Sequence, residues 1–358
     1  MSVIRKIFVG TFAAVLLGGV PAPAFAGDKL ATGIDAYEAE DYAKALAIIE
    51  PIAKAGDDDA QYFMALMYQH GEGVEKSYEQ AAKWYIKSAD QGDSDAQYNL
   101  ALLYEKGLGV EQSDEEALHL YTLSANQGDR HAQNNLANMY DAGQGVEADH
   151  KKAFMLYQKS ARQGNIVAQH NLAIMYEEGS GTRVSLEQAA KWYELAAQEG
   201  YASSQLNLGY LYNNGEGVKQ SYEKAMYWYE LAAEQDVAAA QYNLALMYDE
   251  GQGVEEDNAK AVEWYKKSAA NGDATAQLNL AIMYDEGEGT KQSDQNARYW
   301  YRKAADQDIA PAQYNLGIMY YTGQGVRASE TKAKFWFEKA AALGMEDAID
   351  ALKELEEE

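Results

Sequence analysis

Apolar residues recur along most of the chain with the spacing of amphipathic helices, and short glycine-containing stretches separate the helical segments in pairs. In the segment 93–128 the apolar residues form two series, Ala96, Leu100, Leu103 and Tyr104, then Ala117, Tyr121 and Ala125. Both series follow the 3.6-residue period of a helix that is buried along one face. Gly107 and Gly109 stand between them, where a left-handed residue ends a helix, and Ser113 follows as an N-cap. The segment is therefore predicted to fold as two helices joined by a loop.

This two-helix unit occurs eight times without an insertion. A glutamine marks each unit at intervals of 36 residues: Gln61, Gln97, Gln133, Gln169, Gln205, Gln241, Gln277 and Gln313. The glycines, the Ser or Asp N-cap and two alanine columns keep this register, and all six tryptophans occupy one column of the second helix, which indicates packing. A glycine also closes the second helix, except where Asp236 and Asp308 are expected to take its left-handed conformation. Because such units bury their apolar faces only by stacking, we predict an all-α solenoid over 57–344.

The two ends of the repeat array differ from the units between them. Residues 27–56 match the second half of a unit but have no Gly-x-Gly loop, so we expect a partial repeat that caps the N-terminal end. Residues 345–358 read as an acidic helix that caps the C-terminal end. Polar end units protect the otherwise open core of a solenoid.

Residues 1–26 have the pattern of an export signal. Arg5 and Lys6 precede an uncharged apolar run from Ile7 to Val20, and Ala24-Phe25-Ala26 is an A-x-A cleavage sequence. The apolar run is shorter than the roughly 20 residues that span a bilayer. We therefore expect cleavage after Ala26, no membrane insertion afterwards, and a location in the periplasm, with secretion as the alternative.

The charge of the chain narrows the choice of partners. It carries 56 acidic and 30 basic residues, for a formal net charge of −26, and it has no cysteine. Such a surface repels nucleic acid and favours protein partners with neutral or basic segments. Without cysteine there is no disulfide, thiolate nucleophile or Cys-ligated zinc site.

The repeated motif resembles the Sel-one-like repeat (SLR), a subfamily of the tetratricopeptide-like repeats. In one unit it reads Ala96-Gln97-Tyr98-Asn99-Leu100, then Gly107, Gly109-Val110, Ala117, Tyr121 and Ala125. The resemblance covers 57–344 and implies a right-handed superhelix whose concave face is lined by the first helices. It also implies an adaptor role in protein complexes, and exported bacterial members are associated with envelope assembly, signalling and host interaction.

The motifs that suggest catalysis or metal binding have simpler explanations. Ser221–Lys224 and Ser329–Lys332 have the Ser-x-x-Lys spacing of penicillin-recognising enzymes, but both serines belong to the N-cap column. The Gly-x-Gly loops follow helices rather than strands, unlike phosphate-binding loops. The histidines form no H-x-x-x-H pair. We therefore expect no enzyme, no metal and no cofactor, and a β-lactamase-like hydrolase is only a remote alternative.

An asparagine column on the first helices is the candidate binding element. By resemblance it faces the groove and bonds the backbone of a bound peptide; the alternative is a structural bond to the neighbouring repeat. Aromatic residues at a variable neighbouring position and acids near the helix ends extend this candidate surface. The predicted partner-binding residues are Tyr98, Asn99, Asn135, His170, Asn171, Asn207, Tyr242, Asn243, Asn279, Tyr314 and Asn315, and the predicted acidic rim is Glu105, Asp141, Glu177, Asp249 and Asp285.

These patterns lead to one functional hypothesis and one alternative. The hypothesis is an extracytoplasmic scaffold that holds an extended, neutral or basic segment of a partner protein in its concave groove. The alternative is an envelope protein that binds a glycan, such as peptidoglycan or an exopolysaccharide, because tyrosine- and asparagine-rich grooves also suit sugars.

Overall fold

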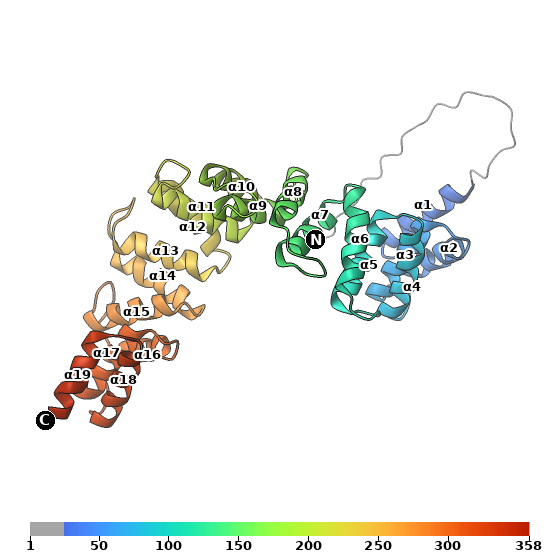
Figure 1. Cartoon of the computed structure of the whole chain (residues 1–358). Coiled ribbons are helices and arrows are strands. Elements are labelled where there is room, and N and C mark those ends of the chain that lie inside the picture. Colours follow the sequence, from blue (N-terminus) through green and yellow to red (C-terminus); the bar gives the residue numbers. More distant parts are fainter. Residues whose placement is uncertain (1–24, 358) are drawn as a thin grey trace. The chain divides into compact units, whose positions relative to one another are not determined.

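The computed structural model describes residues 25–357, and every regular element in that range is an α-helix (Figure 1). The nineteen helices of this range are α1 (Phe25–Glu38), α2 (Tyr42–Lys54), α3 (Asp58–His70), α4 (Tyr78–Asp90), α5 (Ser94–Lys106), α6 (Asp114–Asn126), α7 (Arg130–Ala142), α8 (His150–Arg162), α9 (Ile166–Glu178), α10 (Leu186–Gln198), α11 (Ala202–Asn214), α12 (Tyr222–Ala233), α13 (Ala238–Asp249), α14 (Asn258–Ala270), α15 (Ala274–Glu286), α16 (Asp294–Ala305), α17 (Ala310–Thr322), α18 (Glu330–Ala342) and α19 (Glu346–Glu357). In this range no helix is both long and apolar enough to cross a bilayer.

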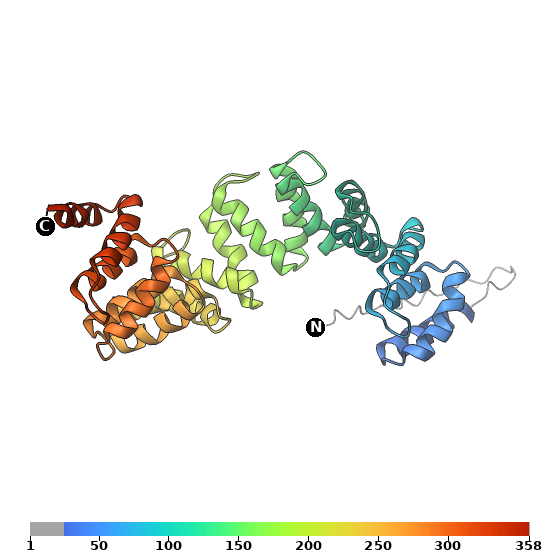
Figure 2. The same cartoon turned by 90° about the horizontal axis from the view of Figure 1, so that it is seen from below.

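The chain divides into two compact units, one ending at Ser124 and one beginning at Ala125. In the first unit α1 packs on α2, α2 on α3, α3 on α4 and α4 on α5. In the second unit the same succession runs without interruption from α7 to α19 (Figure 2). Within each of these runs a helix thus contacts its neighbours in the chain, which is the arrangement of an α-solenoid and confirms the predicted fold class.

The loop inside each repeat is closed by the predicted caps. The Ser or Asp side chain at the N-cap of every second helix from α4 to α18 accepts a hydrogen bond from the backbone N–H three residues later. A row of N-caps on the first helices was not predicted: Asp57, Asp93, Asp129, Asn165 and Asp273. These caps satisfy backbone donors that a helix leaves unpaired at its start.

The second glycine of the loop lies against the preceding repeat. A Cβ at Gly109 would overlap the backbone of Tyr78, the first residue of α4, and the φ of Gly109 is +72°. Gly217 stands in the same relation to Leu186 of α10. The sequence indicated a helix stop at this column, and the structure adds that close contact between repeats requires the missing side chain.

Alanine and aromatic columns form the core. Ala189, Ala225 and Ala261 are fully buried, and so is Tyr193 on α10. Trp228 and Trp336 are also buried, and the other four tryptophans are half-buried, with Trp192, for example, packed against two adjoining core clusters. The tryptophan column therefore serves packing, as predicted.

The residues that close the second helices follow the expected conformation. The glycine column has positive φ, for example +96° at Gly272, and Asp236 and Asp308 have φ of +60° and +59°. Both aspartates thus adopt the left-handed conformation that the glycine column predicts.

Both ends of the array are helical. α1 and α2 are joined by a tight turn in which Glu40 has a φ of +61° and Asp41 caps α2. α19 buries Ala348 and packs Ala351, Leu352 and Leu355 on the last core cluster. Of the predicted export signal, only Phe25 and Ala26 lie among the described residues, at the start of α1.

The glutamine column ties successive repeats together. In all eight units the side-chain amide donates to the carbonyl of the alanine eight residues earlier, near the end of the preceding second helix, at 3.0–3.3 Å. In unit 273–308, Gln277 also accepts from Gln307, which follows α16 (2.9 Å), and Gln307 donates to the carbonyl of Gly272 (3.1 Å). One buried amide thereby links three helices.

Replacing Gln277 by Leu is expected to destabilise the protein by about 1–3 kcal/mol, because the bonds to Ala269 and Gln307 are lost in a buried place. The measurement is urea unfolding followed by circular dichroism. Gln198→Leu, at an exposed position of α10, is the control and is expected to change stability by about 0.5 kcal/mol or less. Equal unfolding midpoints for the two variants would contradict a linking role for the column.

Gly109→Ala is expected to destabilise more than Gly107→Ala in the same loop, by about 1–3 kcal/mol. Both glycines are left-handed, with φ of +72° and +63°, so the conformational strain on alanine is similar. Only the Cβ at position 109 would overlap the backbone of the preceding repeat, whereas at 107 it would meet the Gln112 side chain at 3.3 Å. Equal thermal midpoints would show that close approach is not what requires the second glycine.

Candidate functional site

The predicted partner-binding residues all lie on first helices: Tyr98 and Asn99 on α5, Asn135 on α7, His170 and Asn171 on α9, Asn207 on α11, Tyr242 and Asn243 on α13, Asn279 on α15, and Tyr314 and Asn315 on α17. We call the surface formed by the first helices the first-helix face, and the surface formed by the second helices the second-helix face. Residues of the same column recur at intervals of 36 residues, so within each unit a column forms a row.

The asparagine row bonds to the neighbouring repeat. Asn279 Nδ2 donates to the hydroxyl of Tyr265 on α14, at 3.1 Å. The amides of Asn207, Asn243 and Asn315 stand in the same relation to the hydroxyls of Tyr193, Tyr229 and Tyr301. Asn171 lies beside Tyr157, and its Nδ2 donates to Asn138 at 3.5 Å. Asn99 instead bonds the carbonyl of Asp95, one turn earlier in α5, at 2.8 Å. Of the two roles considered for this row, the structural bond between repeats is thus present, although an amide has a second N–H and two acceptor sites.

The tyrosine hydroxyls continue this network to the carboxylates of the predicted rim. Tyr121 donates to Glu105 and Tyr193 to Glu177, both at 2.6 Å. The same bond joins Tyr265 to Asp249 (3.1 Å) and Tyr301 to Asp285 (3.4 Å). In the second unit, an Asn–Tyr–carboxylate chain therefore recurs at Asn207, Asn279 and Asn315.

Asp141 departs from this pattern. Its carboxylate lies 2.7 Å from Nδ1 of His150, at the start of α8. Tyr157, whose ring stands in the tyrosine row, donates to Asn138 at 2.6 Å instead. Asp141 is therefore partnered at the surface by an imidazole rather than by a buried phenol.

Burial sets the protonation of this network. Burial first, and the nearby carboxylate second, raise the pKa of the Tyr193 hydroxyl far above its usual range, so it stays a donor. Burial also raises the pKa values of Asp249 and Asp285, while the hydrogen bonds from Tyr265, and from Gln324 and Tyr301, act in the opposite direction. Two rim carboxylates are thus held in surroundings that disfavour their charge.

The predicted groove aromatics are less open than expected. Tyr98, Tyr242 and Tyr314 are half-buried, and their rings pack on Tyr121, Tyr265 and Phe337, with centroids 5.6–6.0 Å apart. One side of each ring thus packs against a core ring. These tyrosines contribute to packing as well as to the first-helix face.

The expectation that His170 faces an open groove is wrong. Its side chain is only 9% exposed, Nδ1 lies 2.9 Å from Oγ of Ser204 on α11, and its ring packs against Tyr201. Burial lowers the pKa of His170 to about 4, so the ring is neutral at physiological pH. The small Ser204 lets the imidazole enter the interface between α9 and α11, a relation between repeats that the single column did not reveal.

A row of apolar residues on the first-helix face was not predicted. It comprises Leu102 on α5 and, on the five first helices from α9 to α17, Ile174, Tyr210, Leu246, Ile282 and Ile318, while Asn138 occupies the same column on α7. Tyr210 is 48% exposed, and the aliphatic members are half-buried. Their 36-residue spacing could have revealed the row, but apolar residues on a helix are usually read as core.

The Ser-x-x-Lys sequences are helix caps. Oγ of Ser221 accepts from the backbone N–H of Lys224 (3.3 Å), and Ser329 makes the same bond with Lys332 (3.4 Å). The Lys224 ammonium group points instead to the hydroxyl of Tyr212. Across residues 25–357, no group of three or more His, Asp or Glu side chains is arranged to hold a metal ion.

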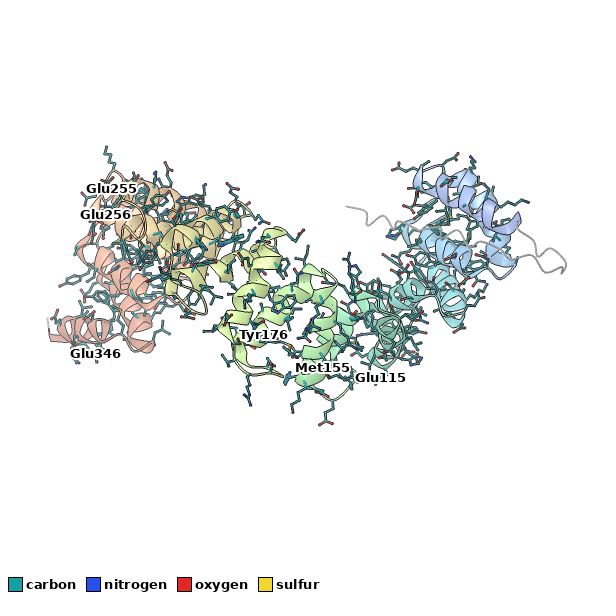
Figure 3. The ribbon with its side chains drawn as sticks, turned by 90° about the horizontal axis from the view of Figure 1, so that it is seen from above. Glu115, Met155, Tyr176, Glu255, Glu256 and Glu346 are labelled. Atoms are coloured by element: carbon teal, nitrogen blue, oxygen red, sulfur yellow. The ribbon has the colours of Figure 1, made fainter. Side chains whose placement is uncertain are left out.

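Charged side chains are unevenly distributed in the second unit. The first helices α13, α15 and α17 carry three acidic residues and no Lys or Arg. Glu255 and Glu256 add charge in the exposed loop between α13 and α14, and Met155 on α8 contributes an exposed thioether to the second-helix face (Figure 3).

The comparisons with known proteins agree with this architecture. The model of the Sel1 repeat matches eight adjoining segments: 58–93, 94–129, 130–165, 166–201, 202–237, 238–273, 274–309 and 310–345. These boundaries lie one residue beyond the predicted ones. No curated protein matches the chain in sequence.

Two solved structures are similar along nearly the whole chain. A Sel1 repeat protein from Oxalobacter formigenes is 29% identical with a TM-score of 0.68, over 96% of this chain and 98% of that one. A protective antigen of uropathogenic Escherichia coli strains, with an SLR fold, is 30% identical with a TM-score of 0.56, over 93% and 88% of the two chains. With eight matching repeats and the helix pairs described above, the chain belongs to the Sel1 repeat family.

Proposed function

We propose that this protein is an extracytoplasmic scaffold whose first-helix face holds an extended, neutral or basic segment of a partner protein. Sel1 repeat proteins generally mediate protein–protein interaction, and their fold is generally a non-catalytic scaffold. The extracytoplasmic part of the proposal rests on the export pattern in residues 1–26.

The chemistry of the first-helix face carries the proposal. Leu246, Ile282 and Ile318 give three successive repeats an apolar contact, and the rim places Asp249 and Asp285 on the same helices, α13 and α15. An extended segment with apolar side chains and some Lys or Arg would match both rows. An acidic segment would meet uncompensated carboxylates and be rejected.

The rim carboxylates are retained at a cost in stability, which favours a functional role. Burial disfavours the charge of Asp249 and Asp285, and acids near the end of a helix also oppose its dipole. A Lys or Arg of a bound segment would offset both effects by pairing with the carboxylate. Residues that break a local rule in this way are typical of functional sites.

The asparagine row has a reduced part in this proposal. The Asn279 amide is already bonded to a tyrosine hydroxyl and the Asn99 amide to a backbone carbonyl, so they offer a peptide only their second N–H or their carbonyl oxygen. Replacing Tyr242 and Asn243 would therefore disturb the contacts with Tyr265 and Tyr229 as well as any bound segment. Binding of a glycan in this groove is less favoured, because the predicted aromatic rings are half-buried against core rings and present less of their surface to a sugar.

A photo-crosslinking residue at position 210 is expected to capture partner proteins in the cells that make this protein. Tyr210 is 48% exposed and lies in the apolar row of α11. The matched control is position 227, a tyrosine on α12 of the same repeat that is 54% exposed on the second-helix face. Crosslinked proteins are separated by electrophoresis and identified by mass spectrometry.

Specific bands at position 210 that are absent at position 227 are the expected result. A captured segment should be neutral or basic, and its peptide should bind the purified protein more weakly at high salt. Bands only at position 227, or captured segments that are uniformly acidic, would rule out the first-helix face as the site.

Asp285→Asn is expected to gain stability relative to the wild type as pH rises. The pKa of Asp285 is raised in the folded state, so ionisation is harder there than in the unfolded chain. The wild type therefore loses stability as pH rises from about 4 through the raised pKa, whereas the amide has nothing to titrate. Urea midpoints of both proteins between about pH 3.5 and 7 test this, and a difference that does not change with pH would contradict it.

A further inference from the structure

The second-helix face of the last three repeats has the opposite charge to the chain as a whole. Helices α14, α16 and α18 together carry nine Lys or Arg residues and four Asp or Glu residues. Their partners α13, α15 and α17 carry three acids and no base. A protein with a net charge of −26 thus presents a basic surface on one side of its second unit.

Three lysines of this surface stand in one column, at intervals of 36 residues: Lys267, Lys303 and Lys339. All three are exposed. Among the described residues, none of their ammonium groups lies within ion-pair distance of a carboxylate, in contrast to Lys260, which pairs with Asp257, and Arg302, which pairs with Asp306. The column therefore offers three positive charges that no side chain of this range neutralises.

Each of these lysines lies over an aromatic ring. Lys267 Nζ is 3.8 Å from the ring centroid of Trp264, and Lys303 Nζ is 5.9 Å from that of Tyr299. Lys339 Nζ lies between two rings, 5.5 Å from the centroid of Phe335 and 5.4 Å from that of Trp336. Cation–π contact holds the ammonium group beside the ring without removing its charge. The unit of the surface is therefore a positive charge next to an aromatic ring. In α14 this ring is the half-buried Trp264, because Glu263 stands at the position of Tyr299 and Phe335.

Two of these rings are more exposed than aromatic packing requires. Tyr299 is 53% exposed and Phe335 is 50% exposed. Each is held edge-to-face by the next residue: Tyr299 by Trp300 (centroids 4.9 Å apart) and Phe335 by Trp336 (5.0 Å). Arg302 of α16 lies over the ring of Trp336 of α18, so the two aromatic pairs belong to adjoining helices. The exposed rings are thus fixed in orientation before any ligand arrives.

We propose that the second-helix face of α14, α16 and α18 binds an anionic polysaccharide. Lys267, Lys303 and Lys339 pair with carboxylates of its sugar acids, and Tyr299 and Phe335 stack on the C–H faces of its pyranose rings. In a chain of sugar acids, each sugar carries both a carboxylate and an apolar ring face. The protein surface likewise presents ammonium groups and aromatic rings at successive repeats. Weak contacts at successive repeats then add to a useful affinity.

The other anionic polymers fit this surface less well. Nucleic acid needs many phosphate contacts to overcome the repulsion of so acidic a protein, and only one unpaired lysine per repeat stands in this column. An anionic bilayer would require a continuous apolar surface to insert, whereas Tyr299 and Phe335 alternate with charged side chains.

The test uses the whole mature protein and polygalacturonate, a defined polymer of a sugar acid, in biolayer interferometry at about 0.1 M salt, where the Debye length of about 10 Å screens the distant carboxylates. The triple variant Lys267→Gln, Lys303→Gln, Lys339→Gln is expected to weaken binding about tenfold. Tyr299→Ser with Phe335→Ser is expected to weaken it similarly. The control Arg183→Gln, Lys219→Gln, Lys291→Gln removes three exposed loop charges from the same unit and is expected to bind like the wild type.

Four outcomes would overturn the proposal. They are no binding of polygalacturonate by the wild type, equal loss in both triple variants, equal binding of uncharged dextran, and preferential binding of an oligonucleotide or of vesicles that contain phosphatidylglycerol. Circular dichroism of each variant confirms that it is folded. Because no substituted residue lies on the first-helix face, a failure here leaves the proposed protein-binding function untouched, and the reverse also holds.

Discussion

The buried amide of the glutamine column is the interaction on which the rest of the structure depends. In every unit it joins a first helix to the last turn of the preceding second helix. In several units it also accepts from a glutamine at the end of the following second helix, namely Gln163, Gln235 or Gln307. A buried amide that loses a partner is costly, so the bond fixes how far each repeat advances and turns relative to the one before. The alanine columns permit this close spacing, and the missing Cβ at Gly109 or Gly217 lets the loop lie on the neighbouring backbone.

The constant spacing explains why single side chains become rows. A residue in a first helix meets the same relative position of the preceding repeat each time, so a bond such as Asn279 to Tyr265 recurs at Asn207 and Asn315 with their own tyrosines. The rows then carry chemistry that no single repeat has. Carboxylates line the first-helix face and lysines line the second-helix face of the last repeats, a difference that the net charge of the chain does not reveal.

The sequence was sufficient for features that depend on one repeat at a time. Helix periodicity, the Ser and Asp caps, the tryptophan packing and the left-handed Asp236 and Asp308 follow from local rules and were predicted correctly. The partners of a side chain in neighbouring repeats could not be predicted from it, although a bond between repeats was one of the two roles considered for the asparagine row. The burial of His170 depends on Ser204 in the next repeat, and the asparagine bonds depend on tyrosines of the preceding one. The periodicity of a single helix shows which of its positions are apolar. In a solenoid it does not show which of these positions pack on a neighbouring helix and which stay half exposed.

The charged residues of the two faces also differ in their effect on folding stability, and this difference bears on their function. On the first-helix face, Asp249 and Asp285 are half-buried acids whose charge the surroundings disfavour, so their presence calls for a partner. On the second-helix face, Lys267 and Lys339 are exposed and well solvated and cost the fold little. The unusual feature of this face is its exposed aromatic surface. Tyr299 and Phe335 leave about half of their surface in water, and each lies beside a buried or half-buried tryptophan. A solenoid that binds an extended polymer on each side needs such rows on both, and the constant step set by the glutamine amides keeps both in register.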